Sequence, residues 1–583
     1  MRILVGQGSC GIAAGANEVF AALATALTEN GITAGLLGTG CMGACYLEPV
    51  VEVINEADEK YTYVKVTPGA AAEIVEKHVK GGTPIRELLI EDEDRKMLDS
   101  QTRIALRNCG VIDPEEISEY ITGGGFEAAK KCLTQLEPWE VISIIKESGL
   151  RGCGGAGFPA WSKWNAAAGV PGKEKYIVCN ADEGDPGAFM DRVILESDPY
   201  SVLEGMLIGG YAVGAAEGLI YIRAEYPLAI KQFGVALGQA RSAGFLGKNL
   251  FGTDFCFDIQ IISGAGSYVC GEETALIASL DGGRGTPRLK PPFPAERGFR
   301  DKPTVINNVE TLAYVPWIII NGGDTFAAMG TGRSSGTKVF ALSGKTKKGG
   351  LVEIPMGMRL REIIFDFCGG IKDERAFKAV QTGGPFGVCV PESLLDTPLT
   401  YEDFSAAGAT FGSGGLVVMD DTTCMVDIAR SFLDFTQKES CGKCSFCRIG
   451  TKLMLEILDR IVAGKGRDGD IERLCELSEK IKAGSMCALG QAAPNPVLST
   501  IRYFRNEYED HIYKKKCPAK SCRALLMFTI DADKCEGCAE CLKKCPTEAI
   551  TGEDKAPHVI DNEKCIGCGR CEAACEFDAV MFE

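Results

Sequence analysis

The sequence predicts a multidomain protein of α/β and α+β folds whose C-terminal part binds metal clusters. The chain has 583 residues, more than one hydrophobic core accommodates, and 45% of them are hydrophobic. Apolar segments alternate with glycine-rich turns over residues 139–333, a pattern typical of Rossmann-like α/β folds. Most cysteines beyond residue 440 stand in tightly spaced runs, which favours metal ligation over disulfides.

Charge and hydropathy exclude several classes of partner. The formal net charge is −17, so we do not expect the basic face that nucleic acid requires. The apolar run 205–216 is short and interrupted by glycines, and no membrane span is expected. The first residues predict the edge of a strand rather than a signal peptide. Because metal-binding thiolates require a reducing compartment, we expect a cytoplasmic protein.

The N-terminal half divides into three expected parts. Residues 1–82 predict an α/β unit, with strands at 3–5, 35–37 and 50–55, a helix at 17–30 and a cysteine loop at 41–45. Residues 83–138 are polar and helical in pattern, which indicates a helical linker. The α/β pattern of residues 139–333 follows.

The C-terminal half changes character several times. Residues 336–420 predict short strands and a helix at 360–367, a small α+β module. Apolar residues at helical spacing over 421–510 predict a helical bundle. Residues 511–526 form a basic hinge that contains cysteines, and residues 527–583 contain an internal repeat.

The repeat carries the most specific motif of the chain. Cys535, Cys538, Cys541 and Cys545 follow the C-x2-C-x2-C-x3-C-P spacing of bacterial ferredoxins, and Cys565, Cys568, Cys571 and Cys575 repeat it. The fourth cysteine of each run ligates the other cluster in such domains. We therefore expect one [4Fe–4S] cluster on Cys535, Cys538, Cys541 and Cys575, and a second on Cys565, Cys568, Cys571 and Cys545. The second run ends in Cys-Glu instead of Cys-Pro, and a zinc ribbon does not explain two four-cysteine runs.

A third [4Fe–4S] cluster is expected upstream. Cys441, Cys444 and Cys447 have the same close spacing and leave one corner of a cubane open. Cys487 is the natural fourth ligand, brought close by the helical segment between. The alternatives are a zinc site with three ligands, or thiols without metal.

Several segments of residues 149–311 combine glycine, charge and amide groups. Residues 149–159 contain G-x-G-x-x-G, a motif that lets the backbone approach a phosphate but is weak evidence by itself. Residues 38–43 contain the same motif, and there it fits a metal-binding loop better. Lys163 is a candidate phosphate partner, and turns at 180–187, 268–273, 290–294 and 306–311 add carboxylates, amides, a cation and an aromatic ring. A structural glycine turn and a solvated acidic loop are the alternatives.

In combination these motifs resemble the NADH-binding flavoprotein subunit of complex I and its relatives in NAD-linked hydrogenases and formate dehydrogenases, over about residues 139–510. With both ends included, the chain resembles the diaphorase subunit of electron-bifurcating [FeFe]-hydrogenases and NADH:ferredoxin complexes. The residues that the resemblance implies at FMN are Gly152, Gly154, Gly155, Lys163, Asn180, Asp182, Glu183, Gly271, Glu272, Asn307 and Asn308. Those implied at NADH are Phe158, Asp185, Glu273, Lys290 and Phe293, and Tyr268 is counted with the cofactor-binding residues.

Two positions depart from the family pattern. Cys153 replaces the usual arginine after Gly152, and Asp185 stands where many relatives have glutamate, which bears on the choice between NADH and NADPH. Residues 336–420 resemble the ubiquitin-like (SLBB-type) module of this family.

Residues 1–82 resemble a thioredoxin-like [2Fe–2S] ferredoxin, whose ligand pattern is C-x4-C followed by C-x3-C. Cys10, Cys41 and Cys45 fit three positions, but the first falls on Val5, which cannot bind iron. Two interpretations stay open: a [2Fe–2S] cluster with a substitute ligand, or a degenerate domain kept for docking.

A zinc site is the hypothesis for the hinge. His511, Cys517 and Cys522 lie close in sequence, and Cys475 of the bundle would complete a Cys3His set; unliganded thiols and a solvent histidine are the alternative. His78 and His558 are expected at the surface. The remaining cysteines are expected to be small buried hydrophobes: Cys109, Cys132, Cys153, Cys179, Cys256, Cys270, Cys368, Cys389 and Cys424.

The resemblance implies an oxidoreductase that takes a hydride from NADH onto FMN without a catalytic side chain of its own. Single electrons would pass through clusters to a small thioredoxin-like [2Fe–2S] subunit, a hydrogenase- or formate-dehydrogenase-type subunit and soluble ferredoxin. The two-cluster tail favours flavin-based electron bifurcation. A simple diaphorase subunit and a non-catalytic electron relay are the alternatives; a quinone reductase subunit docked to a membrane arm fits the fused tail less well.

Overall fold

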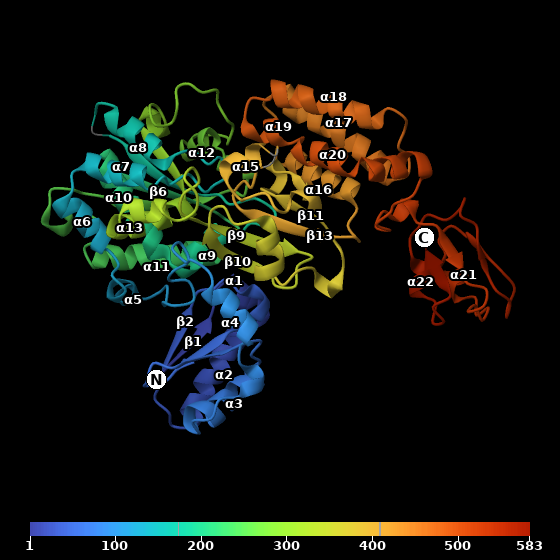
Figure 1. The fold of residues 1–583 in the computed structure, drawn as a ribbon, viewed down its shortest axis with the longest axis horizontal. Helices are drawn as coiled ribbons and strands as arrows, with labels where there is room; N and C mark the ends of the chain where they lie inside the picture. The colour runs from blue at the N-terminus through green and yellow to red at the C-terminus, as the bar shows by residue number, and fades with distance from the viewer. Residues whose placement is uncertain (173, 407, 409, 583) are drawn as a thin grey trace. The chain divides into compact units, whose positions relative to one another are not determined.

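The computed structural model describes residues 1–172, 174–406, 408 and 410–582. The chain divides into two compact units, the first of residues 1–374 and 380–418, the second of residues 375–379 and the chain from 419 onward. Figure 1 shows the elements of both in chain order.

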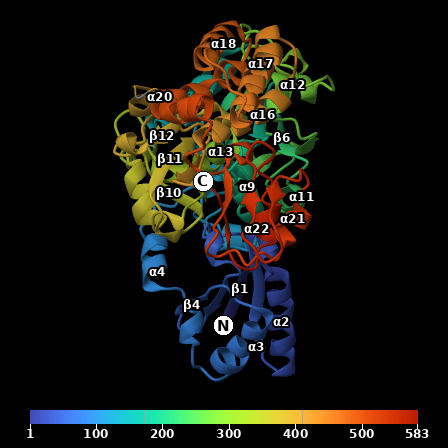
Figure 2. The same cartoon turned by 90° about the vertical axis from the view of Figure 1, so that its right-hand side faces the viewer.

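The N-terminal part is a four-stranded sheet of order β2-β1-β3-β4 with helices packed against it. Its elements are β1 (Arg2–Gly6), α1 (Ser9–Ala14), α2 (Ala16–Glu29), β2 (Gly35–Thr39), β3 (Val51–Ile54), β4 (Lys60–Tyr63) and α3 (Pro68–Glu73). Strand β1 runs parallel to β2 and antiparallel to β3, and β3 runs antiparallel to β4. Helices α2 and α3 lie side by side (Figure 2). Apolar residues such as Val19 and Leu23, at helical spacing, fill the core between α2 and the sheet.

Residues 83–138 are helical in part, but they contribute to the main hydrophobic core of the first unit. They contain α4 (Asp92–Asp99), α5 (Ile117–Thr122) and α6 (Glu127–Gln135). Ile104, Ala105 and Leu106 belong to the largest hydrophobic core, and their backbone N–H groups donate to the buried Glu353 carboxylate at 2.9–3.1 Å. The polar composition of this segment concealed these buried residues.

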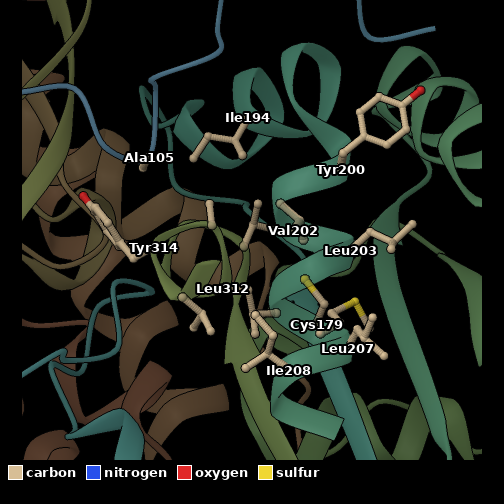
Figure 3. Packing of buried hydrophobic residues seen from close by; sticks show 14 of the residues in the cluster. Ala105, Cys179, Ile194, Tyr200, Val202, Leu203, Leu207, Ile208, Leu312 and Tyr314 are labelled. Atoms are coloured by element: carbon tan, nitrogen blue, oxygen red, sulfur yellow. The ribbon is translucent and has the colours of Figure 1, made fainter. Parts of the chain in front are cut away.

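The largest part is a parallel sheet of order β7-β6-β5-β8 enclosed by helices. The strands are β5 (Tyr176–Ala181), β6 (Glu217–Arg223), β7 (Asp258–Gly264) and β8 (Thr304–Asn308). The helices are α7 (Pro138–Glu147), α8 (Ala160–Gly169), α9 (Met190–Ser197), α10 (Pro199–Val213), α11 (Pro227–Ser242), α12 (Glu273–Leu280), α13 (Val309–Asn321) and α14 (Gly323–Ala327). Helix α10 is buried on almost all sides and lies in the core, where it packs against α13 and β5 (Figure 3).

A five-stranded sheet of order β10-β9-β13-β11-β12 follows. Its elements are β9 (Thr337–Gly344), β10 (Gly350–Pro355), β11 (Phe377–Thr382), β12 (Cys389–Pro391), α15 (Tyr401–Ala406) and β13 (Gly415–Asp420). Strands β9 and β10 are antiparallel neighbours, and β13 runs parallel to β9. The expected helix at 360–367 is a short π-helical segment, Glu362–Phe367.

The second unit contains a helical bundle and a small tail domain. The bundle helices are α16 (Met425–Lys438), α17 (Ser445–Val462), α18 (Asp470–Gly484), α19 (Ala488–Ala492) and α20 (Asn495–Glu509). The tail has β14 (Phe528–Ile530), α21 (Glu540–Lys544), β15 (Ile550–Thr551), β16 (Val559–Ile560), α22 (Arg570–Ala573) and β17 (Val580–Phe582). In the described part of the chain, none of the helices is both long and apolar enough to cross a bilayer.

Candidate functional site

The parallel sheet has a topological switch point between β5 and β8. The chain runs outward from β5 to β6 and β7, then returns to add β8 on the other side of β5. Open α/β sheets bind ligands at the carboxyl ends of the strands that flank such a point. Here those ends carry Asn180 opposite Asn308, followed by Asp182 on one strand. The sequence therefore places amide and carboxylate groups where this topology favours a ligand.

The glycine-rich loop 149–159 lies at this switch point. A Cβ on Gly154 would lie 3.2 Å from Asn308 Cβ, and Gly155 has a left-handed φ of 121°. Both positions favour glycine because a side chain would crowd or strain the loop. The backbone is thus exposed for close approach by a phosphate or ring, as a bound nucleotide requires.

Side chains from two other elements, and one from the loop itself, anchor this loop. The Cys153 N–H donates to Thr311 Oγ1 at 2.9 Å, and Lys338 Nζ donates to the Cys153 carbonyl oxygen at 3.3 Å. Arg151 Nε donates to the Gly157 carbonyl oxygen at 2.8 Å. Of these three anchoring residues, Lys338 in β9 could not be predicted from the sequence, because it lies 185 residues after Cys153.

Lys163 and Lys290 converge on one carboxylate. Lys163 Nζ lies 3.0 Å from Glu273 Oε2, and Lys290 Nζ lies 2.7 Å from Glu273 Oε1. Burial alone would raise the pKa of Glu273, but the two lysines outweigh it and hold the pKa below its ordinary value. Lys163 also donates to the Ile306 carbonyl oxygen at 3.3 Å, which holds it at the end of β8. The two cations are therefore held at the carboxyl edge of the sheet.

Asp185 is held by residues far away in sequence. Ser413 Oγ donates to Asp185 Oδ2 at 2.6 Å, and the Tyr268 hydroxyl donates to Oδ1. Desolvation raises the pKa of Asp185 above its ordinary value, although these hydrogen bonds oppose it. Phe158 and Phe293, each half exposed, provide apolar ring surface.

A second network of carboxylates fixes the strand ends at the switch point. Glu183 is buried and accepts from the Asp191 and Arg192 N–H groups at 3.0 and 3.1 Å. Asn308 Nδ2 donates to Asp191 Oδ2 at 2.5 Å, and Trp164 Nε1 donates to Asn307 Oδ1 at 2.8 Å. The carboxyl ends of β5 and β8 are thereby fixed relative to helices α9 and α8.

The proposed FMN and NADH residues thus come from segments that meet at this edge. Asn180 Nδ2 donates to the Gly271 carbonyl oxygen at 2.9 Å, and Glu272 caps α12 through the Thr274 and Ala275 N–H groups. Gly152 donates to the Phe158 carbonyl oxygen at 2.8 Å and closes the loop. Glycine backbone, two cations and polar strand ends fit a flavin and a nicotinamide nucleotide.

The structure brings Cys441, Cys444, Cys447 and Cys487 together at the start of α17. Cys444 and Cys487 are the residues that precede α17 and α19, and Cys447 lies in the first turn of α17. Burial raises the pKa of the Cys447 thiol to about 11, and the charges of Cys444, Cys487 and Cys441 add to it. A Cβ on Gly490 would lie 3.0 Å from Cys447 Cβ, so this glycine permits the close approach. Four converging thiols are a donor set that fits a [4Fe–4S] cluster.

The two halves of the tail are built alike. The Cys535 and Cys565 N–H groups donate at 3.0 Å to the carbonyl oxygens of Asp531 and Asp561, four residues earlier in each half. Cys535, Cys538, Cys541 and Cys575 line one small cavity, which unites the first run with the last cysteine of the second. Burial raises the pKa of Cys541, and the charges of Cys535, Cys538 and Cys575 contribute. This exchange of the fourth cysteine is the arrangement of two-cluster ferredoxins.

The hinge site corrects one predicted ligand. Cys424, His511, Cys517 and Cys522 are all buried, and their ligand atoms lie within 4.8 Å of one another. His511 Nε2 lies 3.4 Å from both Cys424 Sγ and Cys522 Sγ, while its Nδ1 lies 2.7 Å from the Glu507 carbonyl oxygen. These four residues match the Cys3His donor set that structural zinc sites use, and a backbone carbonyl orients the second imidazole nitrogen.

Cys475, predicted as the fourth ligand, was the wrong choice. It lies in α18 near Arg505, Glu472 and Glu479, outside the four-residue group. Cys424, which the sequence assigned to the buried hydrophobes, takes its place, because α16 packs against α20, the helix that leads to His511. No local spacing relates Cys424 to the hinge, so only the tertiary structure identifies it.

Other predictions for histidine and cysteine need correction. His78 and His558, expected at the surface, are buried, and His78 Nδ1 lies 2.8 Å from the Tyr63 hydroxyl. His558 lines the cavity of the first tail cysteines, and neither of its ring nitrogens has a hydrogen-bond partner in the described structure. Cys256 is only partly buried, whereas Cys109, Cys132, Cys153, Cys179, Cys270, Cys368 and Cys389 are buried as expected.

The N-terminal cysteines also meet. The sulfur atoms of Cys10, Cys41 and Cys45 lie within 4.8 Å of one another. Val5, a residue of β1, is fully buried in the core of the N-terminal part. Val5 therefore offers no ligand, and the structure leaves three thiols at this site.

The fold and these sites together define a nucleotide-binding, iron–sulfur oxidoreductase subunit. Family models match as the Nuo51 FMN-binding domain over residues 145–317, the NADH-ubiquinone oxidoreductase-F iron–sulfur binding region over 427–511 and a 4Fe-4S dicluster domain over 527–576. The chain therefore carries an FMN-binding domain and [4Fe–4S]-binding regions.

Curated relatives are similar over most of the chain. The NADP-reducing hydrogenase subunit HndC of Solidesulfovibrio fructosivorans is 57% identical over 458 residues, which are 79% of this chain and 93% of that protein. The NADH-quinone oxidoreductase F 2 protein of Rhizobium meliloti (strain 1021) is 45% identical over 71% of this chain and 99% of that protein. A solved NAD+-reducing [NiFe]-hydrogenase in the H2-reduced state matches with TM-score 0.63 and 30% identity, covering 88% of this chain and 85% of that one. The chain belongs to the complex I 51 kDa family, which includes the NADH-quinone oxidoreductase F proteins.

Proposed function

We propose that this chain is the NADH-oxidising FMN and iron–sulfur subunit of a hydrogenase-type complex. The observation that carries the proposal is the convergence of the glycine-rich loop, Lys163 and the strand ends of β5 and β8 at one switch point. FMN, when bound, supplies the conversion between two-electron hydride chemistry and single electrons. The chain's own residues bind and orient, and no side chain is assigned a covalent step.

Individual roles follow from position and charge. Lys163 and the backbone of residues 152–155 would hold the flavin phosphate, while Asn180, Asp182, Asn307 and Asn308 would bond ring and ribitol groups. Glu273 with Lys290, Asp185 and the rings of Phe158 and Phe293 would orient the nicotinamide nucleotide. Glu183 and Gly271 would support the flavin side of the site. Asp185 is shorter than the glutamate that many relatives have at this position. Because this change bears on nucleotide choice, the preference of the site for NADH over NADPH is also part of the proposal.

The cysteine sets would hold three [4Fe–4S] clusters as one-electron carriers: Cys441, Cys444, Cys447 and Cys487; Cys535, Cys538, Cys541 and Cys575; and Cys565, Cys568, Cys571 and Cys545. Cys424, His511, Cys517 and Cys522 would bind zinc, which would fix the tail domain to the bundle. The proposed location is the cytoplasm, since these thiolates need a reducing compartment.

Sheet orders support the finer fold assignments. A β-α-β unit followed by an antiparallel hairpin, in the order β2-β1-β3-β4, favours a thioredoxin-like fold for residues 1–82. The order β10-β9-β13-β11-β12 favours a ubiquitin-like module for residues 336–420. Neither assignment bears on the chemistry at the switch point.

The test uses the intact complex, purified without oxygen. We expect about one releasable FMN per chain, and bleaching of the visible spectrum on addition of NADH. Absence of both would favour a non-catalytic relay. The ratio of kcat/KM for NADH to that for NADPH decides the nucleotide preference, because the relative named above is NADP-reducing.

We further propose flavin-based bifurcation as the mode of electron delivery, with a small thioredoxin-like [2Fe–2S] subunit, a hydrogenase- or formate-dehydrogenase-type subunit and soluble ferredoxin as partners. The two-cluster tail supports it by adding an exit toward ferredoxin. Ferredoxin reduction by NADH should depend on a third redox couple such as hydrogen. Equal rates with and without that couple would leave the simple diaphorase as the better description.

A further inference from the structure

The three N-terminal thiols are spaced like ligands of a single ion. Tetrahedral zinc with a Zn–S bond of about 2.3 Å separates two sulfur ligands by roughly 3.8 Å. Among the described residues, only two groups of three or more ligand atoms lie within 4.8 Å of one another: this one and the Cys3His group. In the described part of the chain the cysteines of the cubane motifs form no such group, as is expected of thiolates that bind different irons of a cluster.

A buried carboxylate, Glu48, lies next to this group, although its oxygens stand outside the set of ligand atoms within 4.8 Å of one another. Glu48 is 8% exposed, and its Oε2 accepts from the Val50 N–H at 2.9 Å. Its Oε1 has no hydrogen-bond partner within the described chain. The carboxylate belongs to the third residue after Cys45, and its Oε2 is close to Gly11, the residue that follows Cys10. A buried carboxylate oxygen with no partner is costly unless it bonds a cation or a donor.

Two glycines keep the space for this carboxylate. A Cβ on Gly11 would lie 3.1 Å from Glu48 Oε2, and a Cβ on Gly6 would lie 3.2 Å from it. Gly6 ends β1 one residue after Val5, so the carboxylate reaches the end of the strand that offers no ligand itself.

The surroundings suit a negatively charged site. Arg192 Nη2 lies 4.0 Å from Cys10 Sγ and can offset the charge of three thiolates and a carboxylate on a divalent ion. Ser9, next to Cys10, is fixed by Glu196, whose Oε2 accepts from the Ser9 N–H at 2.9 Å. Both Arg192 and Glu196 belong to α9, so the N-terminal site is held against the α/β domain.

We propose that Cys10, Cys41 and Cys45 bind one zinc ion and that the Glu48 side chain turns toward them to become its fourth ligand. Cys41 belongs to the main hydrophobic core and Cys10 and Cys45 pack against it, although all three lie in the N-terminal segment of the chain, Cys10 in α1. The ion would therefore link the N-terminal domain to the α/β domain as a structural crosslink. This proposal is independent of the proposed NADH and FMN function.

The test measures metal content in the full complex. Wild-type chain, purified without oxygen, should contain about two zinc ions by mass spectrometry, one here and one in the Cys3His group. Glu48→Gln should reduce this to about one, because an amide oxygen is a poor zinc ligand. Glu52→Gln is the matched control: Glu52 is also buried and also has a carboxylate oxygen without a partner, but it is hydrogen-bonded to Thr62 and lies beside Lys60. It should keep both ions.

Cys45→Ser gives a second variant in case Glu48→Gln fails to fold, and FMN content and NADH bleaching are recorded for each. Loss of one zinc with FMN retained supports the proposal, whatever the outcome for NADH oxidation. A wild-type content of about one zinc, or two ions in both variants, overturns it. So does a [2Fe–2S] signal in electron paramagnetic resonance that Cys45→Ser abolishes.

Discussion

Lys338 Nζ lies 2.7 Å from Glu310 Oε2, and both side chains are 1% exposed. The same ammonium group donates to the Cys153 carbonyl oxygen, and Glu310 Oε1 accepts from the Val339 N–H at 2.8 Å. A single buried ion pair thus joins the five-stranded sheet, helix α13 and the glycine-rich loop.

The first prediction concerns this pair. Lys338→Met leaves the Glu310 carboxylate buried without its cation, and removing one partner of such a pair costs about 3–5 kcal/mol. We expect a corresponding loss of unfolding free energy in denaturant titrations and a lower FMN content, because the Cys153 carbonyl loses its anchor. Lys347→Met, which breaks an exposed pair with Glu374, should change stability by less than about 0.5 kcal/mol. Equal stability of the two variants would contradict the prediction.

The second prediction concerns backbone space in the glycine-rich loop. Gly155→Ala places a side chain at a φ of 121°, which costs about 1–2 kcal/mol. FMN content should fall several-fold, measured by fluorescence after release. Gly238→Ala in α11 is the control, since a Cβ there meets no atom within 4 Å and alanine favours a helix by about 0.5–1 kcal/mol. Full FMN occupancy of Gly155→Ala would show that the loop does not approach the cofactor.

The sequence predicts those parts of the site whose residues stand close together along the chain. All the cubane ligands except Cys487 follow from spacings of two or three residues, and the motifs around Asn180, Glu273 and Asn308 are short and contiguous. Once the order of the strands is known, the convergence of these motifs at one edge of the sheet follows. Local patterns therefore yield the class of chemistry.

Other parts depend on contacts between distant segments. Cys424 lies 87 residues from His511, and Lys338 lies 185 residues from Cys153. Residues 83–138 supply buried side chains although their composition is that of a polar linker. Packing of helices and sheets brings these residues together, and a single sequence contains no periodic signal for such contacts.

The third prediction separates the two candidates for the fourth zinc ligand of the hinge. Cys424→Ser should lose about one zinc ion per chain and make the tail easier to release by protease, since the ion supports the hinge. Cys475→Ser should keep its zinc, because Cys475 lies outside the group. Zinc loss from Cys475→Ser with retention by Cys424→Ser would reverse the assignment.

The fourth prediction concerns pH. Desolvation raises the pKa of Asp185 above its ordinary value, so the carboxylate is protonated at higher pH than an exposed aspartate. As pH falls through that raised pKa, Asp185 loses its negative charge and one of its oxygens becomes a hydrogen-bond donor. KM for NADH should therefore rise about three- to tenfold as the pH is lowered from neutrality, with kcat little changed, and the rise should begin at a higher pH than an exposed aspartate would give. Asp185→Asn should have a high KM at every pH; a wild-type KM that does not vary would contradict the prediction.

The fifth prediction concerns His558. Its ring is buried beside Cys535, Cys538, Cys541 and Cys575, and neither nitrogen has a hydrogen-bond partner in the described chain. An N–H aimed at a cluster sulfur would stabilise the more negative reduced form, so its removal should lower the potential of that cluster.

His558→Leu keeps the site filled and removes the donor. A hydrogen bond that differs by about 0.5–1.5 kcal/mol between the two redox states corresponds to a shift of about 20–60 mV for one electron. Redox titration followed by electron paramagnetic resonance should show this shift for one cluster of the tail, with the other unchanged. Tyr513→Leu is the control, since Tyr513 is exposed and bonds Asp468 instead. Because the reduction potential is measured directly, a loss of activity caused by misfolding cannot be mistaken for the expected shift. Identical potentials in His558→Leu and wild type would mean that the ring only fills space.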